Sequence, residues 1–384
     1  MVGIMLCIAG CLAIVALSIS SQPKETQVLG YMSMPTLSVG QHNVFAVDTG
    51  GRLWGWGKNE CNVLLTEGSE ALYPIEVLDS VIGVTIGYDS VLAVRTDDTL
   101  WGWGGNKYGE LGLGTNADVE TPTKIMDDVV AASADMRVSF VLKKDGSLWA
   151  SGHNEYGIFG NGTSDDSNVF VKVMDNIRSF DVGERGIVAV DRDNCLWAWG
   201  ENRIETDEWF YGIILVGGMP ESVNKPHRLM GNVRYACHAR DYLYIIKHDG
   251  ELIKWKTSMS RKTLMRDVKH IDASSWSGAI IANDGSLVCW GFPSIGRYYE
   301  DRSTIAENAE YAVVAGDFIS YIDKENNLYC FGLNHYGLIG NGEDTKPELP
   351  PPPDGGPLLA EYVYPPYRTL ANMAYPEMLS SLGG

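Results

Sequence analysis

The sequence predicts an all-β fold, a seven-bladed β-propeller of four-stranded antiparallel blades, on three observations. A short phrase of apolar and small residues recurs seven times along the 384 residues. Each copy follows another apolar run across a polar turn, and a glycine-spaced loop follows several of the copies. Units of this length cannot bury their apolar faces alone, so they stack against one another in a closed ring.

The recurring phrase is clearest at residues 53–57 and 100–104, where both copies read Leu-Trp-Gly-Trp-Gly. Degenerate copies begin at five later leucines: Leu148, Leu196, Leu252, Leu287 and Leu328. The seven leading leucines are separated by 47, 48, 48, 56, 35 and 41 residues. This spacing indicates one structural unit per copy, with the phrase itself forming a strand.

Each phrase is expected to form a hairpin with the apolar run that precedes it. In three copies an Asp-Gly pair joins the phrase to the preceding apolar run, at residues 145–146, 249–250 and 284–285. Asp-Gly between apolar runs is a strong hairpin signal, because such turns require positive φ. A further apolar run such as 129–132 lies upstream, and a Pro-initiated run such as 74–77 precedes that. Four short strands per unit describe a propeller blade.

A glycine-spaced loop follows the phrase in three copies. It reads Asn-x-x-Gly-x-Leu-Gly-x-Gly at residues 106–114, with close parallels at 154–162 and 334–342. The glycines permit left-handed backbone, and the apolar residue between them is expected to point inward. No copy is followed by Lys-Ser or Lys-Thr, so the loop is not interpreted as a phosphate cradle.

Taken together, these motifs resemble the regulator-of-chromosome-condensation repeat, over about residues 27–345. A WD-type propeller is the alternative, but the Gly-His and Trp-Asp phrases of that repeat are missing. The resemblance implies binding through loops on one face. Nuclear members of the family promote nucleotide exchange on a small GTPase and bind chromatin. Secreted bacterial members include an inhibitor of β-lactamase, and the chain is closest in character to these.

The ends of the chain depart from the repeat. The last phrase has no convincing Pro-initiated run after it, and residues 27–32 align with the outer strand of other copies. We therefore expect an N-terminal strand to close the last blade. The expected organisation is a signal peptide or anchor at 1–23, the propeller at 24–345, and a Pro-rich linker and tail at 346–384. The sequence does not decide whether the tail packs on the propeller.

The N-terminal segment is interpreted as a targeting sequence. Residues 1–20 carry no charge, and the first charged residue is Lys24. A cleaved secretory signal is the favoured interpretation, and an uncleaved membrane anchor or a lipoprotein box ending at Cys11 are the alternatives. Each predicts a secreted or cell-surface protein, unless the anchor inserts in the opposite direction.

Charge and composition restrict the function classes. The 30 Lys and Arg against 49 Asp and Glu give a net charge of −19, which disfavours a nucleic-acid partner. The seven cysteines show no zinc-ligand spacing, and five of them, an odd number, lie in the body. No hydrolase, metalloprotease, Walker or EF-hand motif occurs. We therefore expect no enzyme activity, no metal and no cofactor.

The remaining expectation is a monomeric binding module with a protein partner. A structural surface repeat protein, an exchange-factor-like regulator and a carbohydrate-active enzyme stay open as alternatives. The enzyme would need carboxylates at the mouth of the channel. Four acidic residues are placed to converge there: Asp89, Glu184, Asp241 and Asp317.

Strand order places the inner-to-second loops and the third-to-outer loops on one face, opposite the Asp-Gly turns. The inner-to-second loops vary between copies, and aromatic and Arg side chains dominate binding hot spots. The candidate binding residues of these loops are His42, Tyr88, Asp89, Arg137, Arg185, His238, Arg240, Asp241, Trp276, Asp317 and Phe318. An apolar insertion within 201–230 either folds onto the propeller or forms a binding patch. Its candidate residues are Trp209, Phe210 and Tyr211.

Overall fold

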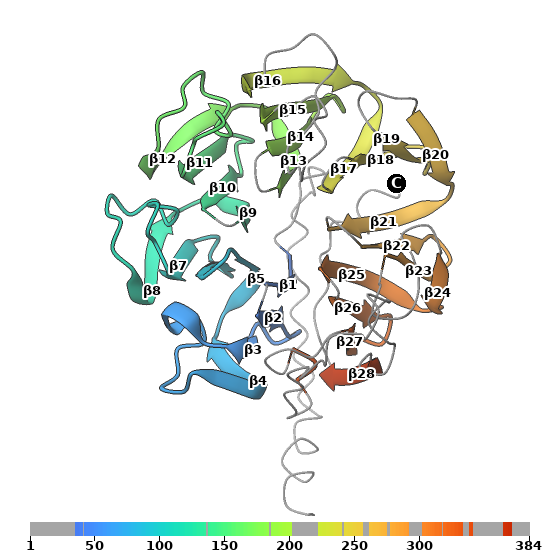
Figure 1. Cartoon of the computed structure of the whole chain (residues 1–384), viewed down its shortest axis with the longest axis horizontal. Coiled ribbons are helices and arrows are strands. Elements are labelled where there is room, and N and C mark those ends of the chain that lie inside the picture. Colours follow the sequence, from blue (N-terminus) through green and yellow to red (C-terminus); the bar gives the residue numbers. More distant parts are fainter. Residues whose placement is uncertain are drawn as a thin grey trace, which may run out of the picture.

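The computed structural model describes most of the repeat region. The described residues are 35–40, 42–135, 137–183, 186–201, 222–239, 242–255, 261–274, 277–291, 302–316, 318–332, 338–340 and 364–370. They form seven four-stranded antiparallel sheets arranged in a ring (Figure 1). The seven-bladed propeller expected from the repeat is confirmed.

Each blade runs from the centre of the ring outward in chain order. The inner strands are β1 (Leu37–Val39), β5 (Val81–Ile86), β9 (Val129–Asp135), β13 (Ile177–Gly183), β17 (Val233–Ala239), β21 (Val268–Ala273) and β25 (Ala309–Ala315). The second strands are β2 (Asn43–Val47), β6 (Ser90–Arg95), β10 (Val138–Lys143), β14 (Gly186–Asp191), β18 (Tyr242–Lys247), β22 (Gly278–Ala282) and β26 (Phe318–Asp323).

The outer half of each blade holds the third and fourth strands. The third strands are β3 (Leu53–Lys58), β7 (Leu100–Gly104), β11 (Leu148–Gly152), β15 (Leu196–Glu201), β19 (Leu252–Trp255), β23 (Leu287–Trp290) and β27 (Leu328–Gly332). The outer strands are β4 (Glu70–Leu78), β8 (Val119–Met126), β12 (Ser167–Met174), β16 (Ser222–Met230), β20 (Arg261–Met265), β24 (Ser303–Ala306) and β28 (Tyr364–Leu370). A short 3-10 helix, η1 (Glu60–Asn62), lies in the first loop.

Every third strand begins at the leucine that opens the repeated phrase, and packing explains the small residue at its centre. A Cβ on Gly55 would lie 2.9 Å from atoms of Phe45 and Leu64. A Cβ on Gly102 would lie 2.7 Å from Ile125. In these two blades the position therefore admits little beyond hydrogen, because the neighbouring strands and loop already fill the space.

The Asp-Gly turns are hairpins, but of a different type from the expected one. Gly146 has a φ of 87°, whereas Asp145 is not among the residues with positive φ. The amide of Gly146 donates to the carbonyl of Lys143 at 2.9 Å, and that of Lys143 donates to the carbonyl of Ser147 at 3.0 Å. This is a turn closed by a glycine bulge rather than a two-residue primed turn.

The core lies between the blades. In the described part of the chain, each of seven apolar clusters combines side chains from two neighbouring blades. Phe45 of the first blade and Trp103 of the second, for example, share one cluster and are both fully buried. The cluster between the seventh and first blades joins Trp56 to Phe318, so the ring is closed by the same packing as elsewhere.

The expected closure by an N-terminal strand is wrong. The fourth place in the seventh blade is taken by β28, which pairs antiparallel with β27 and sets Tyr367 opposite Cys330. The propeller therefore extends past residue 345. Pro366 precedes Tyr367 in β28, as Pro74 precedes Ile75 at the corresponding position of β4. Proline is tolerated there because the outer strand is an edge strand.

Two further expectations concern cysteines and the membrane. The five cysteines in the described ranges are all free, and three of them are buried. Among the described residues, no helix is both long and apolar enough to cross a membrane. Residues 1–23 and 27–32, for which a signal or anchor and a closing strand were predicted, lie outside the described residues.

Candidate functional site

One buried asparagine organises the third-to-outer loop of the second blade. Nδ2 of Asn106 donates to the carbonyl oxygens of Thr115 and Ala117 at 2.9 and 3.0 Å. Its Oδ1 accepts from the amide of Leu111 at 2.9 Å. The amide of Asn106 in turn donates to Oδ1 of Asp118 at 3.0 Å. One side chain thus ties both ends of the loop to its middle, which leaves the loop few free backbone groups.

The third blade repeats this arrangement. Nδ2 of Asn154 donates to the carbonyls of Thr163 and Asp165 at 3.2 and 3.1 Å. Its Oδ1 accepts from the amide of Phe159 at 2.9 Å, and Oδ1 of Asp166 accepts from the amide of Asn154 at 2.7 Å. The corresponding bonds in the first blade join Asn59 to Leu64, Thr66 and Gly68. The Asn-x-x-Gly loop is therefore a rigid element rather than a flexible connection.

The next blade supports each loop from below. Three fully buried indoles donate Nε1 hydrogen bonds of 2.7 to 2.9 Å to loop carbonyls of the preceding blade: Trp56 to Leu338, Trp103 to Val63 and Trp199 to Ile158. In the third blade Ser151 replaces the tryptophan, and its Oγ donates to the carbonyl of Gly109 at 2.7 Å. The second aromatic residue of the repeated phrase thereby fixes the height of the loop above the ring.

The rigid loops contact the inner-to-second loops of the next blade. The thiol of Cys61 lies 3.5 Å from Oδ2 of Asp89. The guanidinium carbon of Arg137 lies 4.9 Å from the ring centre of Tyr108. Two predicted candidates, Asp89 and Arg137, are therefore brought together with residues of the Asn-x-x-Gly loops. We call the surface formed by residues 42, 60, 61, 88, 89, 107, 108, 137, 153, 155 and 166 the loop-face patch.

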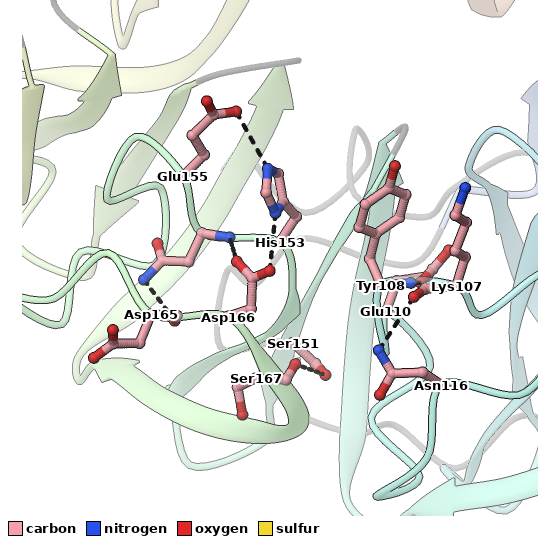
Figure 2. Close-up of polar contacts among 11 residues, drawn as sticks. Lys107, Tyr108, Glu110, Asn116, Ser151, His153, Glu155, Asp165, Asp166 and Ser167 are labelled. Atoms are coloured by element: carbon pink, nitrogen blue, oxygen red, sulfur yellow. Dashed lines mark hydrogen bonds and ion pairs between the residues drawn. The ribbon is translucent and has the colours of Figure 1, made fainter.

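A polar cluster marks the part of this patch over the second and third blades (Figure 2). Nδ1 of His153 lies 3.0 Å from Asp166 and Nε2 lies 3.2 Å from Glu155. Both ring nitrogens can donate to these carboxylates only in the imidazolium form. The imidazole ring lies 5.4 Å from that of Tyr108, over which Lys107 also lies at 5.9 Å. The aromatic ring of Tyr108 is thus flanked by two cationic side chains, Lys107 and Arg137, on a rigid surface.

Acidic residues dominate the part over the first and second blades. Burial raises the pKa of Asp89, and the carboxylates of Asp118 and Glu60 raise it further. Burial also raises the pKa of Glu110, whose carboxylate accepts from the amide of Tyr108 at 2.8 Å. Within the described ranges, no group of three or more His, Cys, Asp or Glu side chains is placed to hold a metal ion.

The thiol of Cys61 belongs to the same acidic area. Partial burial and the neighbouring carboxylate of Asp89 raise the pKa of Cys61 to about 12. The thiol therefore stays protonated at neutral pH and acts as a hydrogen-bond donor rather than as a nucleophile.

The structure places the other predicted binding residues in several kinds of position. His42 is half-buried 3.9 Å from Glu60, and Tyr88 is 44% exposed. The placement of His238 and Phe318 in exposed loops is wrong, because both are buried, in β17 and β26. The other candidates lie outside the described residues: Arg185, Arg240, Asp241, Trp276 and Asp317, with Trp209, Phe210 and Tyr211 of the insertion.

Sequence reasoning missed Tyr108, His153 and Asp166. Their signal is a spacing: the loop asparagine is followed twelve residues later by an aspartate, in both the second and third blades. That aspartate holds the amide of the asparagine, and at Asp166 its second oxygen also holds His153. A loop fixed in this way presents at the surface the two residues that lie between its asparagine and its glycine.

Sequence comparison matches part of the repeat region to one family. Two models described as Regulator of chromosome condensation (RCC1) repeat match residues 97–137 and 81–110. These stretches include β7 and the start of the Asn106 loop. No curated protein matches the chain by sequence.

Solved structures share the fold at low sequence identity. Prp20p from Saccharomyces cerevisiae, described with its binding properties to Gsp1p and histones, is 17% identical with a TM-score of 0.63, covering 84% of this chain and 87% of that one. Yeast Prp20 bound to Kap60 is 17% identical with a TM-score of 0.62, and the match covers 87% of this chain and 89% of that one. The CRINKLY ectodomain of the Arabidopsis thaliana receptor kinase ACR4 is 14% identical with a TM-score of 0.53, and the match covers 80% of this chain and 98% of that one. The chain is a seven-bladed β-propeller in which residues 81–137 match regulator-of-chromosome-condensation repeats.

Proposed function

We propose that the propeller is an extracytoplasmic protein-binding module that acts through the loop-face patch. The observation that carries this proposal is the position of Tyr108, which lies beside Arg137 and His153 on loops fixed by buried asparagines. Tyr and Arg are enriched among residues that dominate binding energy. A surface that is already rigid loses little conformational entropy on binding.

The charge pattern of the patch indicates the kind of partner surface. Lys107 and Arg137 lie over Tyr108, whereas Glu60 and Asp89 lie toward the first blade. A complementary partner presents acidic groups to Lys107 and Arg137, and basic groups to Asp89 and to the exposed carboxylates of Glu155 and Asp166. A partner of this kind is selected by orientation as well as by charge.

The proposed location depends on the N-terminal segment. The uncharged residues 1–20 support export of the propeller or its display at the cell surface. N-terminal sequencing of the protein isolated from its native source, together with protease treatment of intact cells, tests this. A propeller that protease removes from intact cells is expected. A protected chain that retains Met1 contradicts the proposed location.

The alternative is an exchange-factor-like regulator, since the structure of yeast Prp20p is described with its binding to Gsp1p. The shared fold, at 17% identity, supports protein binding more than nucleotide exchange. Release of a fluorescent guanine nucleotide from small GTPases, with and without the full chain, separates the two. Accelerated release favours the regulator.

The binding proposal is tested with the full chain as bait and a double substitution, Tyr108→Ala with Arg137→Ala. The matched control is Tyr73→Ala, which removes an aromatic side chain that is 63% exposed on β4, away from the patch. The captured protein is then titrated against all three baits by calorimetry. We expect at least about a tenfold loss of affinity for the double variant, and none for the control. Equal affinity for all three excludes the patch as the binding surface.

A further inference from the structure

The loop between β11 and β12 carries a three-residue motif that occurs once in the chain. Residues 161–163 read Asn-Gly-Thr, which has the form Asn-x-Ser/Thr of an acceptor for N-linked glycosylation. No other asparagine of the 384 residues is followed two positions later by serine or threonine. The sequence therefore offers a single place of this form, in the third-to-outer loop of the third blade.

The threonine of the motif holds the asparagine side chain in one orientation. Oδ1 of Asn161 accepts from both the amide and the hydroxyl of Thr163, each at 3.0 Å. These two bonds close an Asx turn, and they engage only the oxygen of the side-chain amide. Among the described residues, no group accepts a hydrogen bond from Nδ2 of Asn161. The nitrogen to which a sugar is attached is thus left open.

The motif lies where the finished fold leaves room for a bulky group. Asn161 and Thr163 are both exposed, and so are residues 164–166 that follow them. Phe159, two positions before the motif, is by contrast fully buried. A sugar on Nδ2 of Asn161 therefore extends into solvent and displaces no core side chain.

The next blade fixes the backbone of the motif. The amide of Gly162 donates to the carbonyl of Asn224 in β16 at 2.8 Å, and Nδ2 of Asn224 donates to the carbonyl of Gly162 at 3.0 Å. Gly162 has a φ of 91°, a value that glycine adopts without strain. The backbone that presents Asn161 is thus held by the ring itself.

The second blade shows that the fold does not require an asparagine at this place. Its loop has nearly the same backbone, because the glycines at 112 and 114 have φ of 67° and 77°, against 68° and 91° at 160 and 162. Leu113 occupies the position of Asn161 and packs, half-buried, against the apolar cluster between the second and third blades. The path of the loop is therefore independent of Asn161, which leaves this residue available for a role outside the fold.

We propose that Asn161 carries an N-linked glycan. The reaction joins Nδ2 of Asn161 to the anomeric carbon of a sugar that is carried on a lipid diphosphate. The new C–N bond replaces the C–O bond to the diphosphate, which leaves with that electron pair, and Nδ2 loses one proton. The modification belongs to exported chains, so this inference rests on the proposed extracytoplasmic location.

Peptide mass spectrometry of the full chain isolated from its native source tests the site. Asn161 lies in the tryptic peptide 145–172, together with Asn154 and Asn168. We expect this peptide to carry a sugar, and electron-transfer fragmentation to place the sugar on Asn161. The other two asparagines are internal controls, because neither begins an Asn-x-Ser/Thr motif. An unmodified peptide, or a sugar on either control, overturns the proposal.

Three substitutions, each made in the native source, separate recognition of the motif from folding of the loop. Thr163→Ser keeps the hydroxyl and is expected to keep the sugar. Thr163→Ala retains Asn161 but is expected to lose the sugar completely. Asn116→Gln, an exposed change in the matching loop of the second blade, is the control and is expected to keep the occupancy of the native chain. Equal occupancy in Thr163→Ser and Thr163→Ala overturns the site.

Protease treatment of intact cells distinguishes the failure of this proposal from that of the proposed location. An unmodified Asn161 in a chain that protease removes from the cells overturns the glycan and leaves the location standing. An unmodified Asn161 in a protected chain contradicts both.

Discussion

The two sides of the ring hold their blades together differently. From the seventh blade round to the fourth, an indole or a hydroxyl group of one blade lies beneath the loop of the preceding blade and donates to its carbonyl. Inner-strand hydroxyl groups also bridge blades there, since Ser38 accepts from the amide of Ile86 and Thr85 from that of Ala134. From the fourth blade to the seventh, the described bridges include charged and imidazole side chains of the inner strands. Those side chains are Arg178, Asp181, Arg234, Lys269, His270 and Asp272.

The loops of the two sides also differ in sequence. The Asn-x-x-Gly motif follows the first phrase in degenerate form and is clear after the second, third and seventh, but it is missing at 202–221, 256–260 and 292–301. These three stretches lie outside the described residues. The inner strands beside them carry polar groups, as where Asp272 accepts from the amide of Val314 at 2.7 Å. Beside the degenerate repeats, the described inter-blade bonds thus involve ionisable side chains of the inner strands, where Ser38 and Thr85 serve on the other side.

The largest effect is expected where an indole supports a loop. Trp103→Ala removes a fully buried side chain and its bond to Val63, and is expected to cost about 4 kcal/mol of unfolding free energy. Trp290→Ala is the matched control, because Trp290 is only half-buried, over the blade with the shortest loop. Urea unfolding of both variants measures the difference. Equal losses contradict the comparison between the two sides.

A smaller loss is expected from the asparagine within the loop. Asn154→Ala leaves the amide of Phe159 and two carbonyls without their partner, which is expected to cost about 2–3 kcal/mol. Asn161→Ala, an exposed change in the same loop, is expected to stay within about 1 kcal/mol of the native chain. If the two substitutions cost the same in urea unfolding, the buried asparagine does not organise the loop.

The other side of the ring is expected to depend on pH. Burial raises the pKa of Asp181 to about 8, and the carboxylate accepts from the amide of His238 at 2.8 Å. An unfolded aspartate has a pKa of about 3.9, so the folded state holds a proton that the unfolded state has lost. The unfolding free energy therefore falls as the pH rises from about 4 to about 8, and this loss is complete above the folded pKa.

Asp181→Asn keeps an acceptor for that amide and removes the titration. The variant is expected to lose less stability than the native chain between pH 5 and pH 9, as measured by urea unfolding across that range. Burial also raises the pKa of Asp272, to about 6, so part of the dependence remains. Asp165→Asn, in an exposed loop, is the control. Parallel profiles for the native chain and Asp181→Asn contradict the expectation.

The fold was predictable because its signal is repeated. The seven leucines each open a third strand, and the apolar residues Leu111 and Phe159 of the loops are fully buried as expected. The closing strand was not predicted, because 364–370 follows β27 after a long Pro-rich stretch that breaks the spacing. The signal for this strand is Pro366, which occupies the same position in its strand as Pro74 does in β4. Counting the spacing between repeats does not use this signal.

The site was less predictable than the fold. Variation between copies points to the loops of Asp89 and Arg137, but it does not separate a loop residue from the first residue of a strand. Phe318 shows the error, since it begins β26 and points into the core between the seventh and first blades. Which loop residue meets which depends on contacts between blades, such as Tyr108 with Arg137, and these are set by the ring rather than by the local sequence.

Hydrogen exchange in the native state measures directly whether the Asn-x-x-Gly loops are the rigid platform that the proposed binding requires. The amides of Leu64, Leu111 and Phe159 donate to the asparagine side chains that organise these loops. They are expected to exchange within about tenfold of the rates in the adjoining strands β3, β7 and β11. Exchange of these amides at the rate of freely exposed loop amides contradicts the account.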